Sequence, residues 1–135
     1  MQQVTPGARN ASVAQTALLT LATASVNSGI ALAVLNLSSA HPDGKFILYD
    51  SNTFLNKISS EPSAYNITSL SNCMVSDPPF SIGGDDNATL VSICNNPNRF
   101  FFWDGIHPTT KGHELIAKSV AAVMAKHALV PYGWT

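Results

Sequence analysis

Charged residues are few in this sequence, and neither sign of charge forms a cluster. Only 11% of the 135 residues are charged, and the formal net charge is −1. Lys and Arg are scattered along the chain, so it lacks the basic patch by which proteins bind nucleic acid or an anionic membrane. Spacings typical of a metal site or a cofactor motif are also missing, and we expect neither a metal nor a cofactor. Hydrophobic residues make up 45%, which fits one globular domain.

A long, purely apolar run is also missing. The uncharged stretch 10–42 is interrupted by Gln, Thr, Ser and Asn, and its longest apolar run covers only residues 29–35. A membrane-spanning helix needs about 20 mostly apolar residues, so we expect no transmembrane segment. Residues 1–6 lack the basic start and apolar block of a signal peptide. If the protein is secreted, we expect its signal to lie outside this sequence.

Cysteine is scarce as well, with only Cys73 and Cys94 present. Two free buried thiols and one disulfide are both open readings of such a pair. Four acceptor sequons for N-glycosylation favour the disulfide, because both features belong to secreted proteins. A bridge would close about 20 residues and stabilise the fold by roughly 3 kcal/mol. The sequons begin at Asn10, Asn36, Asn66 and Asn87.

Hydrophobic periodicity predicts a long first helix over residues 11–39. A turn-forming cluster at residues 41–44 ends it, and the apolar residues 45–49 then predict a buried, parallel strand because they follow a helix directly. A short helix is expected over residues 52–59. The predicted buried face of the first helix comprises Val26, Ile30, Ala33, Val34 and Leu37.

The second half of the chain begins with a long, Pro-, Gly- and Asn-rich stretch, residues 62–99, in which we expect one strand at 89–93. Residues 100–103 predict a buried strand, although their rings could also line an acyl pocket. A last helix is expected from a cap at Thr109 or Thr110 to about His127. Its apolar stripe comprises Leu115, Ile116, Val120, Val123 and Met124.

These elements do not add up to a closed domain. The strand at 45–49 is the only strongly predicted one, and a single parallel strand can neither satisfy its backbone groups nor form a sheet. The helices carry apolar faces that a sheet would normally cover. We therefore expect an α/β fold with an incomplete sheet, in which residues 1–135 form the last part of a larger domain.

An acid and an imidazole stand three residues apart just before the last helix. In a Ser-His-Asp hydrolase the imidazole takes the proton of the serine, and the carboxylate orients the imidazole and stabilises its charged form. Asp104 and His107 can meet in this way within one loop. The same pair could instead be ordinary polar loop residues that precede a helix cap.

The stretch from Phe102 to Thr109, F-W-D-G-I-H-P-T, is more specific than that pair. Together with Gly112-His113 and Ile116-Ala117 it resembles the closing motif of the SGNH hydrolases, the GDSL lipases and esterases. In that family the closing D-x-x-H-P-T supplies the triad acid and base, so the resemblance implies that Asp104 orients and His107 is the base. Weaker likenesses cover Asn27, Leu32, residues 46–50 and 62–65, and the cysteine pair Cys73 and Cys94.

This resemblance implies the C-terminal portion of a three-layer α/β/α, flavodoxin-like domain. The uncharged, sequon-bearing chain is similar to secreted fungal-type members, which act on lipid or carbohydrate esters. The family's G-D-S block and its oxyanion blocks do not occur here. Ser51 follows Asp50 after a predicted strand, but Tyr49 stands where the family has glycine, and we do not expect Ser51 to be the nucleophile.

The chain alone is therefore expected to be inactive, and the pattern leaves its oligomeric state open. The alternative is a non-catalytic secreted glycoprotein fragment or a degenerate binding module. Two further candidates have structural readings that we favour. We expect His113 to be a helix-start histidine packed on the sheet rather than a metal ligand, and residues 83–87 to be a turn rather than a calcium loop.

Overall fold

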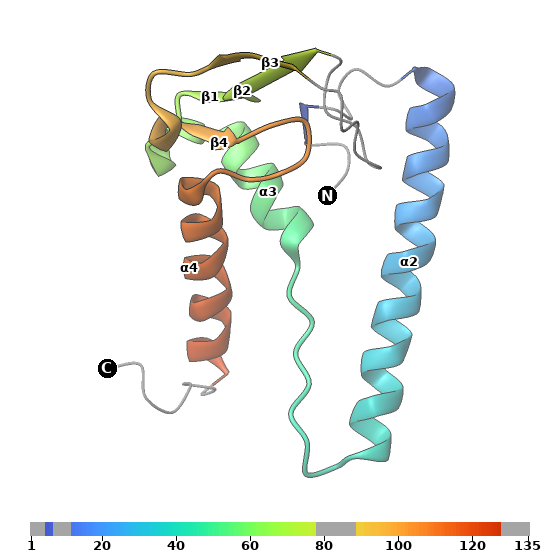
Figure 1. Cartoon of the computed structure of the whole chain (residues 1–135). Coiled ribbons are helices and arrows are strands. Elements are labelled where there is room, and N and C mark those ends of the chain that lie inside the picture. Colours follow the sequence, from blue (N-terminus) through green and yellow to red (C-terminus); the bar gives the residue numbers. More distant parts are fainter. Residues whose placement is uncertain (1–4, 7–11, 78–88, 128–135) are drawn as a thin grey trace.

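The computed structural model describes residues 5–6, 12–77 and 89–127 of the chain (Figure 1). Within these ranges the elements are helices, short 3-10 helices and short strands, in the order α2, α3, η1, β1, β2, β3, η2, β4 and α4. The helices are α2 (Val13–Ala40), α3 (Ser51–Ser60), η1 (Pro62–Tyr65), η2 (Pro97–Arg99) and α4 (Thr110–Lys126). The strands are β1 (Ser69–Asn72), β2 (Met74–Asp77), β3 (Thr89–Ile93) and β4 (Phe100–Phe102).

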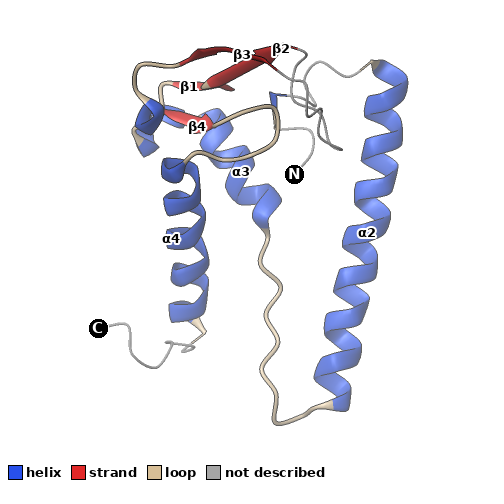
Figure 2. Ribbon diagram, viewed as in Figure 1, coloured by secondary structure: helices blue, strands red, loops and turns tan. Residues whose placement is uncertain are grey.

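The four strands form two separate two-stranded sheets (Figure 2). β1 and β4 pair in parallel, whereas β2 and β3 form an antiparallel pair. The mixed α/β structure with an incomplete sheet agrees with the fold class predicted from the sequence. β1 and β2 lie in the stretch where we expected a loop. They were not predicted because a strand such as Ser-Leu-Ser-Asn shows too little alternation of apolar and polar residues.

Helix α2 is the longest element, and its N-terminus is closed by a capping box. The side chain of Ser12 accepts a hydrogen bond from the Gln15 backbone, and the Gln15 side chain accepts one from the Ser12 backbone. None of its 28 residues is buried. The helix was predicted correctly, but its predicted buried face was wrong, because the described part of the chain has no sheet to cover it.

Residues 45–49 were predicted to be a strand and are not one. They are extended in shape and run between α4 and α2 (Figure 1), but no described strand pairs with them. The prediction failed for the reason already apparent in the sequence: a strand forms only when a neighbour supplies the other half of its hydrogen bonds. Two side chains tie the segment to the last helix: Tyr49 donates a hydrogen bond to Ser119 of α4 at 2.9 Å, and Lys45 donates one to the carbonyl of His127 just beyond α4.

The core is small and lies where α3, η1, β4 and the start of α4 meet. Phe101 and Phe102 of β4 are almost fully buried, with ring centroids 4.9 Å apart in an edge-to-face arrangement. Partly buried residues of α3 and η1 pack around them. The buried members are Leu55, Ile58, Ile67, Phe101, Phe102 and Leu115. The strand predicted at residues 100–103 is therefore confirmed over its first three residues, and it is buried at the second and third of them.

By length and composition alone, α2 would be able to cross a membrane. The core helix of a larger soluble protein and a signal sequence meet the same criterion, so this property does not distinguish among them. The absence of a transmembrane segment stays a prediction.

Candidate active site

The connection between β4 and α4 is a short loop closed by backbone hydrogen bonds. The Trp103 amide donates to the carbonyl of His107 at 2.7 Å, and the Thr109 amide donates to the carbonyl of Phe101 at 2.9 Å. Between these two bonds, Phe102 and Pro108 form an antiparallel bridge. The chain therefore leaves β4, turns within a few residues and returns alongside it, which fixes the backbone on both sides of the Asp104–His107 pair.

Thr109 anchors the end of this loop to the start of α4. Its hydroxyl donates to the carbonyl of Phe100 at 2.7 Å and accepts the amide of Gly112 at 3.0 Å, which makes Thr109 the N-cap of the helix. The side chain is buried. Of the two threonines that could have capped this helix, the structure uses Thr109.

Within the loop, Asp104 and His107 are in direct contact. Oδ2 of Asp104 lies 2.7 Å from Nδ1 of His107. The other carboxylate oxygen, Oδ1, accepts the backbone amides of Ile106 at 2.9 Å and His107 at 2.7 Å. Asp104 is buried, whereas the side chain of His107 is 55% exposed. The carboxylate is thus held by three hydrogen bonds, while the imidazole remains accessible from solvent.

Two opposing effects set the charge state of Asp104. Burial alone would raise the pKa of its carboxyl group, but the hydrogen bonds from the His107 and Ile106 amides and from the His107 ring together outweigh burial, and the pKa lies below its ordinary value. Asp104 is therefore ionised at neutral pH and only accepts hydrogen bonds. Nδ1 of His107 must then carry the proton, and in the neutral ring Nε2 carries the lone pair. Such a tautomer suits a general base.

A disulfide lies next to the residues that lead into this loop. Cys73 and Cys94 are bonded, with Cα atoms 4.8 Å apart, as the sequence predicted. The Cys73 amide donates to the Phe102 carbonyl at 3.1 Å, and the Met74 amide donates to the Trp103 carbonyl at 2.6 Å. These two carbonyls belong to the residues that immediately precede Asp104. The cross-linked β2–β3 pair thus contacts the strand end from which the acid projects.

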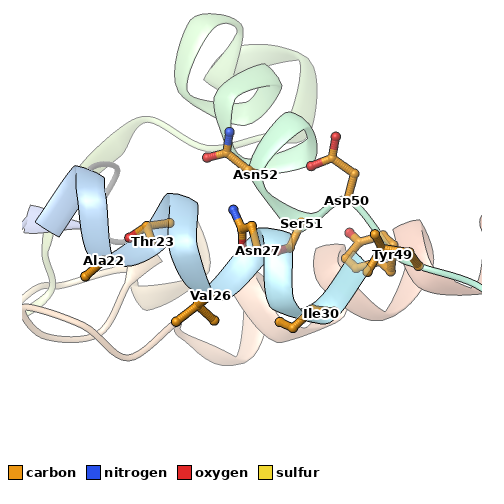
Figure 3. A pocket seen from close by; sticks show the side chains of 10 residues that line it. Ala22, Thr23, Val26, Asn27, Ile30, Tyr49, Asp50, Ser51 and Asn52 are labelled. Carbon is orange, nitrogen blue, oxygen red and sulfur yellow. The ribbon is translucent and has the colours of Figure 1, made fainter. Parts of the chain in front are cut away.

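Ser51, the serine that follows an aspartate after the predicted strand, lies at the start of a different helix from the one that follows His107. Ser51 is the first residue of α3, and Asp50 before it is the helix N-cap, whose Oδ1 and Oδ2 accept the amide and hydroxyl of Thr53 at 3.0 and 2.7 Å. Ser51 lines an open cavity of about 710 Å³ between α2 and the start of α3 (Figure 3). Neither Asp104 nor His107 lines this cavity. Asp50 and Ser51 thus form the start of a helix, with Asp50 as its N-cap.

The prediction that His113 packs on the sheet was wrong, because its side chain is exposed. Its neighbour Glu114 instead forms ion pairs along α4 with Lys111, at 3.0 Å, and with Lys118. Within the described ranges, no three His, Cys, Asp or Glu residues are grouped so that they could hold a metal ion. The turn predicted at residues 83–87 lies outside those ranges.

The aromatic residues 100–103 at β4 contribute mainly to the hydrophobic core. The rings of Phe101 and Phe102 are buried there, whereas Phe100 and Trp103 are half-buried. Of the four rings that could have lined an acyl pocket, only these last two retain exposed surface to do so.

The asparagines of two of the four sequons, Asn10 and Asn87, lie outside the described residues. The other two asparagines, Asn36 and Asn66, are exposed. Asn66 has a left-handed backbone with φ of 61°, and its side-chain oxygen accepts a hydrogen bond from Arg99 at 3.0 Å. Glycosylation at these positions stays a prediction.

Comparison with known proteins identifies the family. The sequence profile of the family described as GDSL-like Lipase/Acylhydrolase matches residues 4–120. The match covers most of the chain and includes α2, α3 and the Asp104–His107 loop. The chain belongs to this family.

Three of the relatives come from one plant. The anther-specific proline-rich protein APG of Arabidopsis thaliana is 28% identical over 92 residues, which cover 68% of this chain and 17% of the relative. Two GDSL esterase/lipases of the same plant are each 24% identical over 103 residues, which cover 73% of this chain and 26% of each relative. The chain thus spans about a quarter of their length or less. The fungal-type likeness expected from the sequence gains no support from these relatives.

Proposed function

We propose that this chain is the C-terminal portion of a GDSL-type serine ester hydrolase and supplies its orienting acid, Asp104, and its base, His107. The observation that carries the proposal is the 2.7 Å contact between a buried, ionised carboxylate and Nδ1 of a half-exposed imidazole. Family membership supports the reaction class. The acid–base roles rest on this geometry and on the chemistry it permits.

The proposed step is a proton transfer followed by acyl transfer. Nε2 of His107 would take the proton of a serine hydroxyl as the serine oxygen attacks the ester carbonyl, and Asp104 would stabilise the imidazolium that forms. The imidazolium then gives the proton to the departing alcohol, leaving an acyl-enzyme that water hydrolyses. The serine and the oxyanion donors would come from polypeptide that this sequence does not contain. Lipid and carbohydrate esters are the substrate classes we propose.

We also propose that the protein is secreted. The Cys73–Cys94 disulfide supports this, because such bridges persist in oxidising compartments. The four N-glycosylation sequons also support secretion.

Ester hydrolysis by the isolated chain tests whether the nucleophile lies outside this sequence. We expect no hydrolysis of a short-chain nitrophenyl ester above the rate of the His107→Ala variant, because an imidazole without a nucleophile retains little of a triad's rate enhancement. Hydrolysis by the chain alone that disappears in His107→Ala would contradict the proposal and make Ser51 the nucleophile to examine.

The second candidate function is a non-catalytic binding module or glycoprotein fragment. The absence of any G-D-S block within the sequence favours it. The coding sequence immediately before Met1 separates the two candidates. A G-D-S block and a G-x-N-D block there would support the hydrolase, and their absence would support the binding module.

A further inference from the structure

Two aspartates in the sequence, Asp43 and Asp104, are followed directly by glycine. Such a step can rearrange without an enzyme, because glycine has no side chain to keep its backbone nitrogen away from the preceding carboxyl group. The glycine nitrogen attacks Cγ of the aspartate, a C–N bond forms, and one carboxyl oxygen leaves as water. The product is a cyclic succinimide. The two sites share this local chemistry, so the structure around each one determines how fast it reacts.

Water then opens the succinimide at either of its two carbonyl carbons, and the water lost in the first step is regained. One opening restores aspartate. The other gives isoaspartate, in which the main chain runs through the former side-chain carbons. At Asp104 this product would break the 2.7 Å contact between the carboxylate and Nδ1 of His107. Isomerisation at this residue would therefore destroy the geometry of the candidate site.

Asp43 lies in the exposed turn that follows α2, and the glycine after it is exposed as well. The amide of Gly44 closes this turn by donating to the carbonyl of His41 at 2.9 Å. Attack by the Gly44 nitrogen has to break that hydrogen bond. Because the turn is exposed, water can take the place of the lost partner, and the bond gives little protection.

The carboxylate of Asp104 is held much more firmly. Its Oδ1 accepts the amides of Ile106 at 2.9 Å and His107 at 2.7 Å, and its Oδ2 lies 2.7 Å from Nδ1 of His107. Whichever oxygen leaves as water, at least one of these hydrogen bonds must break. Asp104 and Gly105 are both buried, so water does not replace the lost bond unless the loop opens.

The charge of Asp104 adds to this protection. The oxygen leaves as water from a protonated carboxyl group, whereas an ionised carboxylate resists attack by a nitrogen. The hydrogen bonds to Asp104 hold its pKa below the ordinary value despite burial. The contacts that block the departure of either oxygen thus also keep the carboxylate in its unreactive form at neutral pH.

We propose that the Asp104–Gly105 step is a latent isomerisation site, which the hydrogen bonds to its carboxylate keep unreactive while the protein is folded. The exposed Asp43–Gly44 step is then the one at which the folded protein isomerises. The proposal needs only the geometry of the loop and does not depend on the catalytic roles of Asp104 and His107.

Ageing of the full 135-residue chain at pH 7, folded or in guanidinium chloride, tests the proposal. Peptide mapping with endoproteinase Asp-N, which cleaves before aspartate but not before isoaspartate, locates the product by mass spectrometry. In the denatured chain both sites should react at similar rates, since glycine follows each aspartate. Folding should slow the reaction by on the order of 100-fold at residue 104 and by about fivefold or less at residue 43.

His107→Ala removes the contact at Oδ2 of Asp104 and leaves the backbone of the loop unchanged. In the folded variant, isoaspartate at residue 104 should form on the order of 10-fold faster than in the wild type, the effect of losing one hydrogen bond to a charged group. Residue 43 should keep its rate. The control His113→Ala changes an exposed histidine of α4 and should alter neither rate.

Isoaspartate that forms at residue 104 as fast in the folded chain as in the denatured chain would overturn the proposal. A folded His107→Ala variant in which residue 104 stays as protected as in the wild type would also overturn it. Neither readout involves ester hydrolysis, so failure of this proposal and failure of the proposed function are distinguishable.

Discussion

Gly112, in the first turn of α4, lies directly against the carbonyl oxygen of Phe101 in β4. A Cβ atom at Gly112 would meet this oxygen at 2.5 Å and Cβ of Pro108 at 2.8 Å. Two of these three residues flank the loop that holds Asp104 and His107. The absence of a side chain at Gly112 therefore allows α4 to approach β4 closely enough to close that loop.

Gly112→Ala should lower the free energy of unfolding by about 1–3 kcal/mol, because the helix must move away from β4. Urea denaturation followed by near-UV circular dichroism measures the change. Gly29→Ala is the matched control, since a Cβ there meets nothing within 4 Å. Alanine should favour α2 by about 1 kcal/mol at that position. Equal effects of the two substitutions would show that the close contact at Gly112 has no energetic consequence.

Asp104→Asn should change the tautomer of His107. The ionised carboxylate only accepts a hydrogen bond, so it keeps the proton on Nδ1, whereas an amide can also donate and removes that constraint. Long-range nitrogen–proton NMR spectra at pH 8 should show protonated Nδ1 in the wild type and a tautomer mixture in the variant. A wild-type ring with its proton on Nε2 would contradict the site geometry.

The lowered pKa of Asp104 predicts a pH-dependent contribution to stability. A carboxyl group with a depressed pKa in the folded state stabilises the fold above its unfolded pKa of about 3.9, and this contribution is lost as the pH falls through the folded value. Asp104→Asn should cost about 2 kcal/mol at pH 7. The difference from the wild type should shrink below pH 4. Urea titrations at pH 7 and at pH 2 measure it, and a difference that stays constant would argue against ionised Asp104.

Reduction of the Cys73–Cys94 disulfide should destabilise the body of the protein. Residues 21 apart in sequence are joined, and the loop-entropy estimate gives about 3 kcal/mol. The urea midpoint with and without reductant measures this loss. Amide exchange at Ile106 and His107 should also accelerate, because the bridged strand contacts the residues before Asp104. Unchanged exchange there on reduction would separate the disulfide from the site.

The sequence predicted the parts of this structure whose chemistry is local. The sequence predicted a cap at Thr109 or Thr110, and the structure uses Thr109, whose side chain bonds to the third residue beyond it. It also predicted that Asp104 and His107 can meet within one loop, and they do. The disulfide between the two cysteines was predicted because the same sequence carries four N-glycosylation sequons, and the structure contains this disulfide.

Features that depend on a distant partner were not predicted correctly. The strand at residues 45–49 needs neighbouring strands, and the buried face of α2 needs a sheet to cover it. Neither is present among the described residues, so a correct local pattern gave an element that did not form and a face that stayed exposed. The four-residue strands β1 and β2 were missed for the converse reason, since their pairing with β4 and β3 determines them and their own residues do not.

Ester hydrolysis by the complemented protein tests the central claim most directly. The wild-type chain, joined with the nucleophile-bearing portion of a GDSL esterase/lipase, should hydrolyse a short-chain nitrophenyl ester. The same complex made with His107→Ala should lose that activity by on the order of 10⁴-fold or more. Asp104→Asn should fall between the two, because the base remains but its orientation is lost. A complex that forms normally and hydrolyses the ester equally well with His107→Ala would contradict the account.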